Sequence, residues 1–211
     1  MSSNRETAIW ILAGAALLAV GAGTLWTRAL GKGDEAKEKS VVVAGTYVGS
    51  KKCKKCHRVE YKSWEKTKMA VSFEILAPGA MAAEKTAAKL DPEQDYRKDA
   101  KCVGCHTVGF GEEGGFSLKA SDRDNLSLLG VGCESCHGPA GGWLANGLHD
   151  SDYKEKANHA ERLPLQIAKG YVPEPKEEDC KRCHNEKSPS FKEAFDYEKR
   201  KDEGVHEHPK K

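Results

Sequence analysis

Large apolar and aromatic side chains are scarce in this chain. Phe, Trp and Tyr make up only 7% of its 211 residues, whereas 31% of the residues are charged. The mean hydropathy is −0.66, so ordinary side chains can form only a thin core. No segment shows the apolar–polar alternation that predicts strands, which argues against a sheet-based fold. Lys and Arg are interspersed with Asp and Glu, so the charge pattern does not favour nucleic-acid binding.

No cysteine lies outside a single five-residue pattern, Cys-x-x-Cys-His, which occurs four times. The copies are Cys53-Lys-Lys-Cys56-His57, Cys102-Val-Gly-Cys105-His106, Cys133-Glu-Ser-Cys136-His137 and Cys180-Lys-Arg-Cys183-His184. This pattern is the attachment signature of c-type haem. Zinc ribbons and a disulfide scaffold are the alternatives, but neither requires a His directly after the second Cys. The sequence therefore predicts four covalently bound haems c.

The spacing within each motif suits this chemistry. Two thiols three positions apart lie on one face of a helical turn, where they reach the two vinyl groups along one edge of a porphyrin. The following His gives its imidazole to the iron as the proximal ligand. The expected proximal ligands are His57, His106, His137 and His184. Each porphyrin also adds a large apolar disc, so we expect the chain without haem to be largely unfolded.

One long uncharged segment runs from Ala8 to Trp26. Its 19 residues span about 28 Å as a helix, close to the thickness of one hydrocarbon core. A cleaved signal peptide is the alternative, although its apolar region is usually shorter. The expected organisation is a membrane anchor or signal peptide at 1–26, a flexible tether at 27–45 and a tetrahaem domain at 46–211. Because bacteria attach c-type haem outside the cytoplasmic membrane, we expect the haem domain to face the periplasm.

The haem domain is expected to consist of helices and loops. Apolar residues at 3–4 spacing predict a helix from Arg58 to Leu76, and a second helix is expected from Met81 to Leu90. Ser188 followed by Pro189 predicts the start of a third helix, which ends near Asp202. The Gly- and Ser-rich segment 109–129 predicts loop with a short hairpin. The predicted fold class is mainly α with extensive loops, wrapped around four haems and preceded by a single transmembrane helix.

The ligand on the far side of each iron decides what that haem does. A haem with two protein ligands transfers electrons, whereas a haem with an open position can bind a small molecule. The candidates for this second position are His149, His159, His206, His208, Met69 and Met81. A solvated histidine and a packed methionine are the alternatives. The residues favour His149 and His206 over His159 and His208.

Several segments carry a family resemblance. They are Lys51-Lys-Cys-Lys-Lys-Cys-His57, Ser63-Trp64, Leu90-Asp-Pro92, Cys102-Val-Gly-Cys-His106, Gly130-Val-Gly-Cys-Glu-Ser-Cys-His-Gly-Pro139 and His206-Glu-His208, in this order. From about Tyr47 to His208 the chain resembles the tetrahaem cytochrome c-554 family, the electron acceptor of hydroxylamine oxidation in ammonia oxidisers. The membrane anchor is a departure from the soluble member of that family.

The resemblance implies a ligand for most of the irons. In the family three haems have two His ligands and the haem at the second motif is five-coordinate. Carried over, His149 would ligate the first haem, His206 the fourth, and the haem at His106 would keep an open site. Where the family has a distal His for the third haem, this sequence has Met69, whose thioether would raise the potential of that haem. The alternatives for the third haem are His159 or an open position.

Three functions fit these features. The first is a membrane-anchored electron carrier that passes electrons between a redox donor, the quinol pool included, and a redox acceptor, without any catalytic residue. The second is a small-molecule reductase, acting on nitric oxide at the open haem of His106. The third is a quinol dehydrogenase that feeds periplasmic reductases. In that type the first motif lies close behind the anchor, whereas here about 26 residues separate Trp26 from Cys53.

Overall fold

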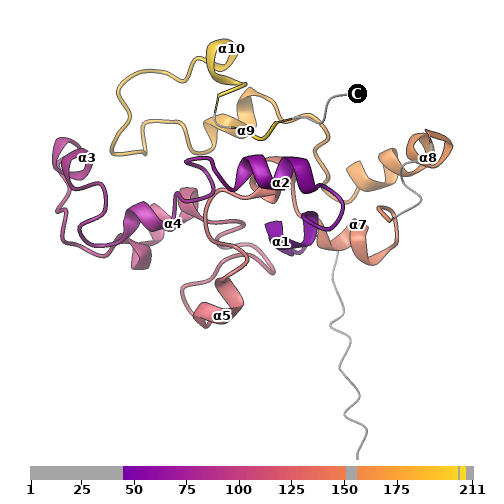
Figure 1. Ribbon diagram of the computed structural model, residues 1–211, viewed down its shortest axis with the longest axis horizontal. Helices are drawn as coiled ribbons and strands as arrows, with labels where there is room; N and C mark the ends of the chain where they lie inside the picture. Colours follow the sequence, from indigo (N-terminus) through magenta and orange to yellow (C-terminus); the bar gives the residue numbers. More distant parts are fainter. Residues whose placement is uncertain (1–44, 151–155, 204, 208–211) are drawn as a thin grey trace, which may run out of the picture. The chain divides into compact units, whose positions relative to one another are not determined.

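The computed structural model describes residues 45–150, 156–203 and 205–207 as short helices joined by long loops (Figure 1). The α-helices are α1 (Ser50–Cys53), α2 (Arg58–Trp64), α3 (Ala82–Ala87), α4 (Ala100–His106), α5 (Asp122–Asn125), α6 (Cys133–His137), α7 (Gly141–Ala145), α8 (Lys156–Ile167), α9 (Glu177–Lys181) and α10 (Tyr197–Arg200). Two 3₁₀ turns, η1 (Glu74–Leu76) and η2 (Tyr96–Lys98), complete the elements. The expected fold, mainly α with extensive loops, is confirmed for this part of the chain.

The expected N-terminal anchor, residues 1–26, and all of the tether but residue 45 lie outside the described residues. Among the residues that the structure does describe, no helix has the length and apolar character needed to cross a membrane.

Side-chain caps explain why several of the helices begin where they do. Asp99 accepts a hydrogen bond from the backbone N–H of Lys101 at the start of α4, and Ser121 does the same at α5. Asp196 caps α10 in the same way. Each cap satisfies a backbone donor that has no partner within its helix. In α4 the cap therefore fixes a helical turn that contains the whole second motif.

Two of the three helix predictions need correction. The helix expected from Arg58 to Leu76 ends at Trp64, because Thr67 Oγ1 bonds to the carbonyl of Trp64 at 2.7 Å and replaces the helical pattern there. The helix expected from Ser188 is not formed until α10, since the Ser188 hydroxyl meets Ser190 Oγ at 3.1 Å instead of capping a backbone N–H.

The predicted helix between Met81 and Leu90 is present as α3, one residue inside the expected start and three inside the expected end. The segment 109–129 is mostly loop, as expected, and contains the short helix α5. An isolated antiparallel bridge joins Leu129 at its end to Thr107, two residues before its start. The longest described helix, α8, contains Pro164 and was not anticipated from the sequence.

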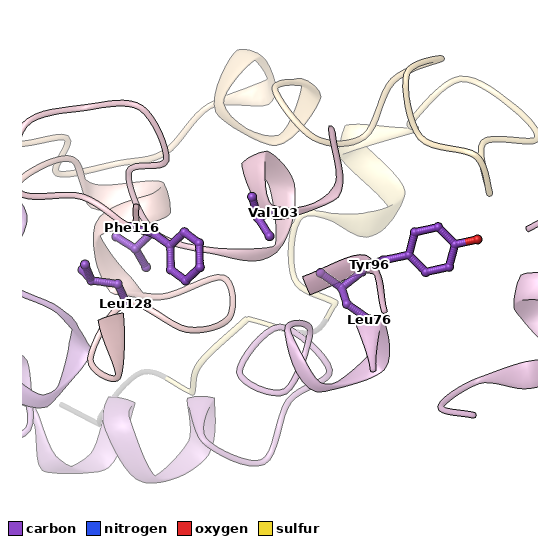
Figure 2. Packing of buried hydrophobic residues seen from close by; sticks show 6 residues of the cluster. Leu76, Tyr96, Val103, Phe116 and Leu128 are labelled. Carbon is purple, nitrogen blue, oxygen red and sulfur yellow. The ribbon is translucent and has the colours of Figure 1, made fainter. Parts of the chain in front are cut away.

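The apolar core is small and surrounds the second motif. Its buried members are Leu76, Tyr96, Val103, Val108, Phe116 and Leu128 (Figure 2). Phe116 links the cluster to its half-buried neighbours, with ring centroids 5.7 Å from Phe73 and 6.3 Å from Phe110. Val103, which lies between the two cysteines of the second motif, is completely buried. The core therefore anchors α4 and leaves the other three motifs to be held by other contacts.

Candidate functional site

Each of the four motifs is built on a helical turn. The second and third motifs lie within α4 and α6. In the first and fourth motifs the helix ends at or just after the first cysteine, but the His57 N–H still bonds to the Cys53 carbonyl at 2.9 Å. The His184 N–H makes the same bond to Cys180 at 3.0 Å. The thiol pairs therefore lie on one face of a turn, as haem attachment requires.

The two alternatives that use paired cysteines find no support in the described part of the chain. No two of the eight cysteines are joined in a disulfide. The described residues also contain no group of three or more His, Cys, Asp or Glu side chains with the geometry of a metal site. A Cys₄ zinc ribbon would appear as such a group.

Thiols of different motifs lie close together in a definite order. The Cys53 thiol donates a hydrogen bond to Cys133, which raises the pKa of Cys53 and lowers that of Cys133 to about 7. Burial, followed by the neighbouring Cys105, raises the pKa of Cys183 to about 12. Burial, followed by Cys180, raises the pKa of Cys136 to about 11. The motifs are therefore neighbours in the order first, third, fourth, second.

Three of the four proximal histidines have their Nδ1 atom near an oxygen. His106 Nδ1 lies 2.6 Å from the Ser72 carbonyl, and His137 Nδ1 lies 2.9 Å from the Val172 carbonyl. His57 Nδ1 is 3.7 Å from a carboxylate oxygen of Glu60. A hydrogen bond from Nδ1 fixes the tautomer and leaves Nε2 free to bind a metal. The Ser72 and Val172 carbonyls are therefore placed to orient His106 and His137 as haem ligation requires, whereas the Glu60 carboxylate is too far from His57 for a hydrogen bond.

His149 lies opposite His57. Their Nε2 atoms are 3.2 Å apart, and the rings are nearly parallel, with centroids separated by 5.5 Å and planes inclined by 11°. The Trp143 ring packs edge-on against His149 at 5.2 Å. Burial, and then the proximity of His57, lower the pKa of His149, which favours the neutral imidazole that a metal binds. The two metal-binding nitrogens therefore face each other across one small region.

The indole of Trp143 is a second feature that suits a haem. Its Nε1 donor is buried and has no hydrogen-bond partner among the described residues. Buried polar groups are normally paired, so an unpaired donor points to an acceptor that comes from outside the chain. A haem propionate is an acceptor of this kind, and the residues here fit the group that the cysteine motifs predict.

The structure places His206 near the third motif. Its ring centroid lies 6.1 Å from that of His137, with the planes inclined by 33°. The tail that carries it is held by the Glu207 N–H, which donates to Ser63 Oγ at 2.8 Å. The resemblance had implied that His206 serves the fourth haem. Which iron His206 ligates stays a prediction.

The fourth motif has an aromatic neighbour. The His184 ring is stacked on Phe195, with centroids 4.6 Å apart and planes inclined by 26°. Both side chains line a cavity of about 340 Å³, together with Phe191 and Arg200. Among the described residues no second histidine ring packs against His184 or His106. His208 lies outside the described residues, and His159 is an exposed residue of α8.

Met69 lies at the approach to the third motif. Its carbonyl accepts a hydrogen bond from the Val131 N–H at 2.9 Å, and its side chain is half-buried. The backbone of Met69 therefore lies beside Val131, which is two residues before Cys133 in the sequence. No contact between the Met69 sulfur and His137 is present among the described interactions. Its role as an iron ligand stays a prediction.

Glu134 is a site residue that sequence reasoning missed. It lies between the two cysteines of the third motif and is only 3% exposed. Its carboxylate accepts hydrogen bonds from three backbone N–H groups: Val48 at 3.0 Å, Gly49 at 2.7 Å and Ala140 at 2.8 Å. Burial raises the pKa of Glu134 while the three backbone donors oppose that shift. Gly49 has φ 80°, and a Cβ there would come within 2.5 Å of the Ser127 carbonyl, so the contact needs glycine.

The Glu134 contacts connect two parts of the chain that are far apart in sequence. The segment that precedes the first motif is joined through them to the third motif, and the Ser50 hydroxyl adds a bond from the Cys133 N–H at 3.2 Å. The only signal in the sequence was that an acidic residue lies between the two cysteines. Without the fold, a buried carboxylate at this position cannot be distinguished from an exposed one.

Comparisons with known proteins agree with these features. The family described as cytochrome c554 and c-prime matches residues 52–138. Cytochrome c-554 of Nitrosomonas europaea is 37% identical over 147 residues, which cover 69% of this chain but 60% of that protein. The solved structure of the reduced state of cytochrome c554 from Nitrosomonas europaea superposes with a TM-score of 0.64 at 33% identity, covering 79% of this chain and 87% of that one. Together with the four motifs, these matches establish four covalently attached c-type haems.

Proposed function

This chain belongs to the cytochrome c-554 family, and from that premise we propose that it transfers electrons through its four haems. The observation that carries the proposal is that cysteines of different motifs lie close enough to interact, by hydrogen bonds from first to third and from fourth to second, and electrostatically from third to fourth. Haem supplies reversible one-electron chemistry at each motif. The chain attaches, orients and partly buries these groups, and neighbouring motifs keep them within reach of one another.

We further propose distal ligands for two of the irons. His149 serves the first haem, because its Nε2 faces that of His57 in a parallel arrangement. His206 serves the third haem, because its ring lies beside His137. Met69 is the competing candidate for the third haem, since its backbone lies next to the same motif. These two pairs assign no distal ligand to the haems at His106 and His184.

The proposed setting is the outer face of the cytoplasmic membrane, where c-type haem is attached in bacteria. The support for a single-pass anchor is the uncharged segment from Ala8 to Trp26. The electron donor would be a redox protein or the quinol pool, and the electron acceptor would be a second redox protein. Recovery of the haem protein in the membrane fraction after a carbonate wash is expected, and its quantitative release would contradict the anchor.

The test of the electron-transfer proposal is a redox titration of the purified holoprotein, followed by its haem absorbance. Four reversible one-electron steps per chain are expected, with electron paramagnetic resonance of the oxidised form showing low-spin signals from the two proposed His pairs. Haems that cannot be reversibly reduced would contradict an electron carrier.

A second candidate function rests on the surroundings of His106. Its ring has no contact with another histidine among the described residues, which favours an open position on that iron. We propose a small-molecule reductase activity towards nitric oxide as the alternative. A high-spin iron that nitric oxide converts to a nitrosyl signal, with steady turnover, would support it. Four low-spin irons would exclude it.

A further inference from the structure

The first motif is surrounded by exposed positive charge. Between residues 51 and 68 the chain has eight cations and only two carboxylates, Glu60 and Glu65. All eight cationic side chains are exposed. They form what we call the lysine-rich stripe: Lys51, Lys52, Lys54, Lys55, Arg58, Lys62, Lys66 and Lys68.

The stripe gathers eight cations within 18 residues, and their charges are not neutralised. Within the described part of the chain, none of its eight cations forms an ion pair with a carboxylate. Lys54 instead lies over the Tyr61 ring at 4.7 Å, which leaves its charge in place. Elsewhere some cations are paired, among them Arg97 with Asp95 and Arg162 with Asp150, and the described lysines that are not paired, such as Lys119, do not form a run of this density.

The four motifs allow a direct comparison, because each has two residues between its cysteines. In the second motif these residues include the buried Val103, and in the third they include the buried Glu134. In the fourth motif they are Lys181 and Arg182, which are neutralised by Glu177 at 2.6 Å and by Asp179 at 3.4 Å.

Only the first motif has two exposed cations between its cysteines that lack a described carboxylate partner. Covalent attachment through Cys53 and Cys56 keeps Lys54 and Lys55 beside the bonded edge of the first haem. The first motif is also an end of the succession of motif contacts, because the third motif is its one thiol neighbour in the described interactions. Positive charge is therefore concentrated beside the first haem, which is at one end of the series of neighbouring haems and is where a redox partner would bind.

We propose that the lysine-rich stripe is the docking surface for an acidic redox protein that exchanges electrons with the first haem. This inference rests on the proposed electron-transfer function and names the chemistry of one partner. Unpaired surface charges of one sign steer a partner of opposite sign and raise association rates by a factor of 10 to 1,000. They contribute less to the affinity itself, which suits a partner that must dissociate after each transfer.

A protein partner fits the stripe better than a membrane surface does. Binding to the membrane interface requires a broad apolar face next to the basic one. Within residues 51–68 the exposed large apolar side chain is Val59, at 49% exposure, whereas Trp64 turns inward and donates to the Val131 carbonyl at 2.9 Å. The stripe is therefore almost purely charged.

The test measures oxidation of the fully reduced holoprotein by two small probes of opposite charge, hexacyanoferrate(III) and tris(phenanthroline)cobalt(III), over a range of ionic strength. The stripe variant replaces four lysines by glutamine: Lys51, Lys52, Lys54 and Lys55. The matched control removes the same charge from four exposed lysines elsewhere: Lys98, Lys119, Lys187 and Lys192. For the wild type, we expect the anionic probe to react about tenfold faster at low than at high salt.

The stripe variant should lose most of that salt dependence with the anionic probe, whereas the control variant should keep it. Poly-L-glutamate should slow the wild-type reaction with hexacyanoferrate and have little effect on the stripe variant. The proposal would be overturned if the stripe variant and the control variant showed the same salt dependence and the same response to poly-L-glutamate. That result is expected if the haem propionates of the same chain neutralise the stripe lysines.

A membrane role is the remaining alternative. The wild type and the stripe variant are also sedimented with phosphatidylglycerol vesicles. If only the wild type sediments with the vesicles, and the two proteins respond equally to poly-L-glutamate, the proposal is overturned and the stripe is assigned to lipid binding. Failure of the wild type to react with either probe is a separate result, because it would contradict the electron-transfer function itself.

Discussion

Replacement of Glu134 by alanine is expected to destabilise the holoprotein strongly. The carboxylate accepts three backbone N–H bonds, and those from Gly49 and Ala140 are buried. A buried donor left without a partner costs about 1–3 kcal/mol, so the two buried donors alone predict a loss of roughly 2–6 kcal/mol. Water that enters the space left by the side chain would offset part of this, and we expect about 3 kcal/mol.

Glu134→Gln is the conservative comparison. Its side-chain carbonyl can accept from one or two of the donors, but its amide N–H₂ would face the remaining one. We therefore expect a loss of about 1–2 kcal/mol, between the wild type and the alanine variant. Glu113→Ala is the matched control, because Glu113 is exposed and no hydrogen bond or ion pair of its side chain occurs among the described contacts.

The assay is unfolding by guanidinium chloride, followed by the near-ultraviolet and haem circular dichroism of protein confirmed by mass to contain four haems. The mass measurement is needed because Glu134 lies between two attachment cysteines, and a variant with fewer haems would lose stability for a different reason. An alanine variant within about 0.5 kcal/mol of Glu113→Ala, the range typical of neutral surface changes, would refute the reasoning.

Other predictions address the ligands, the surface and the cofactor. His149→Ala and His206→Ala should each convert one low-spin iron to high-spin in the electron paramagnetic resonance spectrum, and an unchanged spectrum would remove that residue from the ligand set. Met69→Ala should leave the spin states unchanged if His206 serves the third iron, and a new high-spin signal would reverse this assignment. Hydrogen bonding to Arg97 lowers the pKa of Asp95 to about 2, so its contribution to stability should be complete above pH 3.8 and be lost as the pH falls towards 2. Asp95→Asn should flatten that part of the stability–pH curve, and an unchanged curve would refute the pairing. Chain produced without haem attachment should show little helical signal in far-ultraviolet circular dichroism, whereas a native-like spectrum would show that the haems are not needed for folding.

The attachment chemistry could be predicted from the sequence because it depends on five consecutive residues. A Cys-x-x-Cys-His motif needs only one helical turn to place its groups, and such turns are present at all four copies. The helix at α3 was also predictable, since its three alanines, Glu84 and Lys85 favour a helix without help from tertiary contacts.

The remaining features depend on contacts between distant segments. His206 and Ser63 belong to parts of the chain separated by more than 140 positions, and the bond that holds the tail there leaves no trace in local spacing. The early end of α2 follows from one threonine hydroxyl that competes for a backbone carbonyl. Glu134 resembled any acidic surface residue until the segment 48–49 was seen to lie against it.

The order in which the motifs touch has a consequence for biogenesis. Synthesis from the N-terminus produces the motifs in the order first, second, third, fourth, but the neighbour of the first motif contains Cys133, 80 residues after Cys53. The second motif waits for the fourth in the same way. No two motifs that emerge in immediate succession are neighbours until the fourth joins the third. The first and second motifs are therefore made before either has a neighbouring motif, and the series of four is complete only when the last quarter of the chain, which contains the fourth motif, is present.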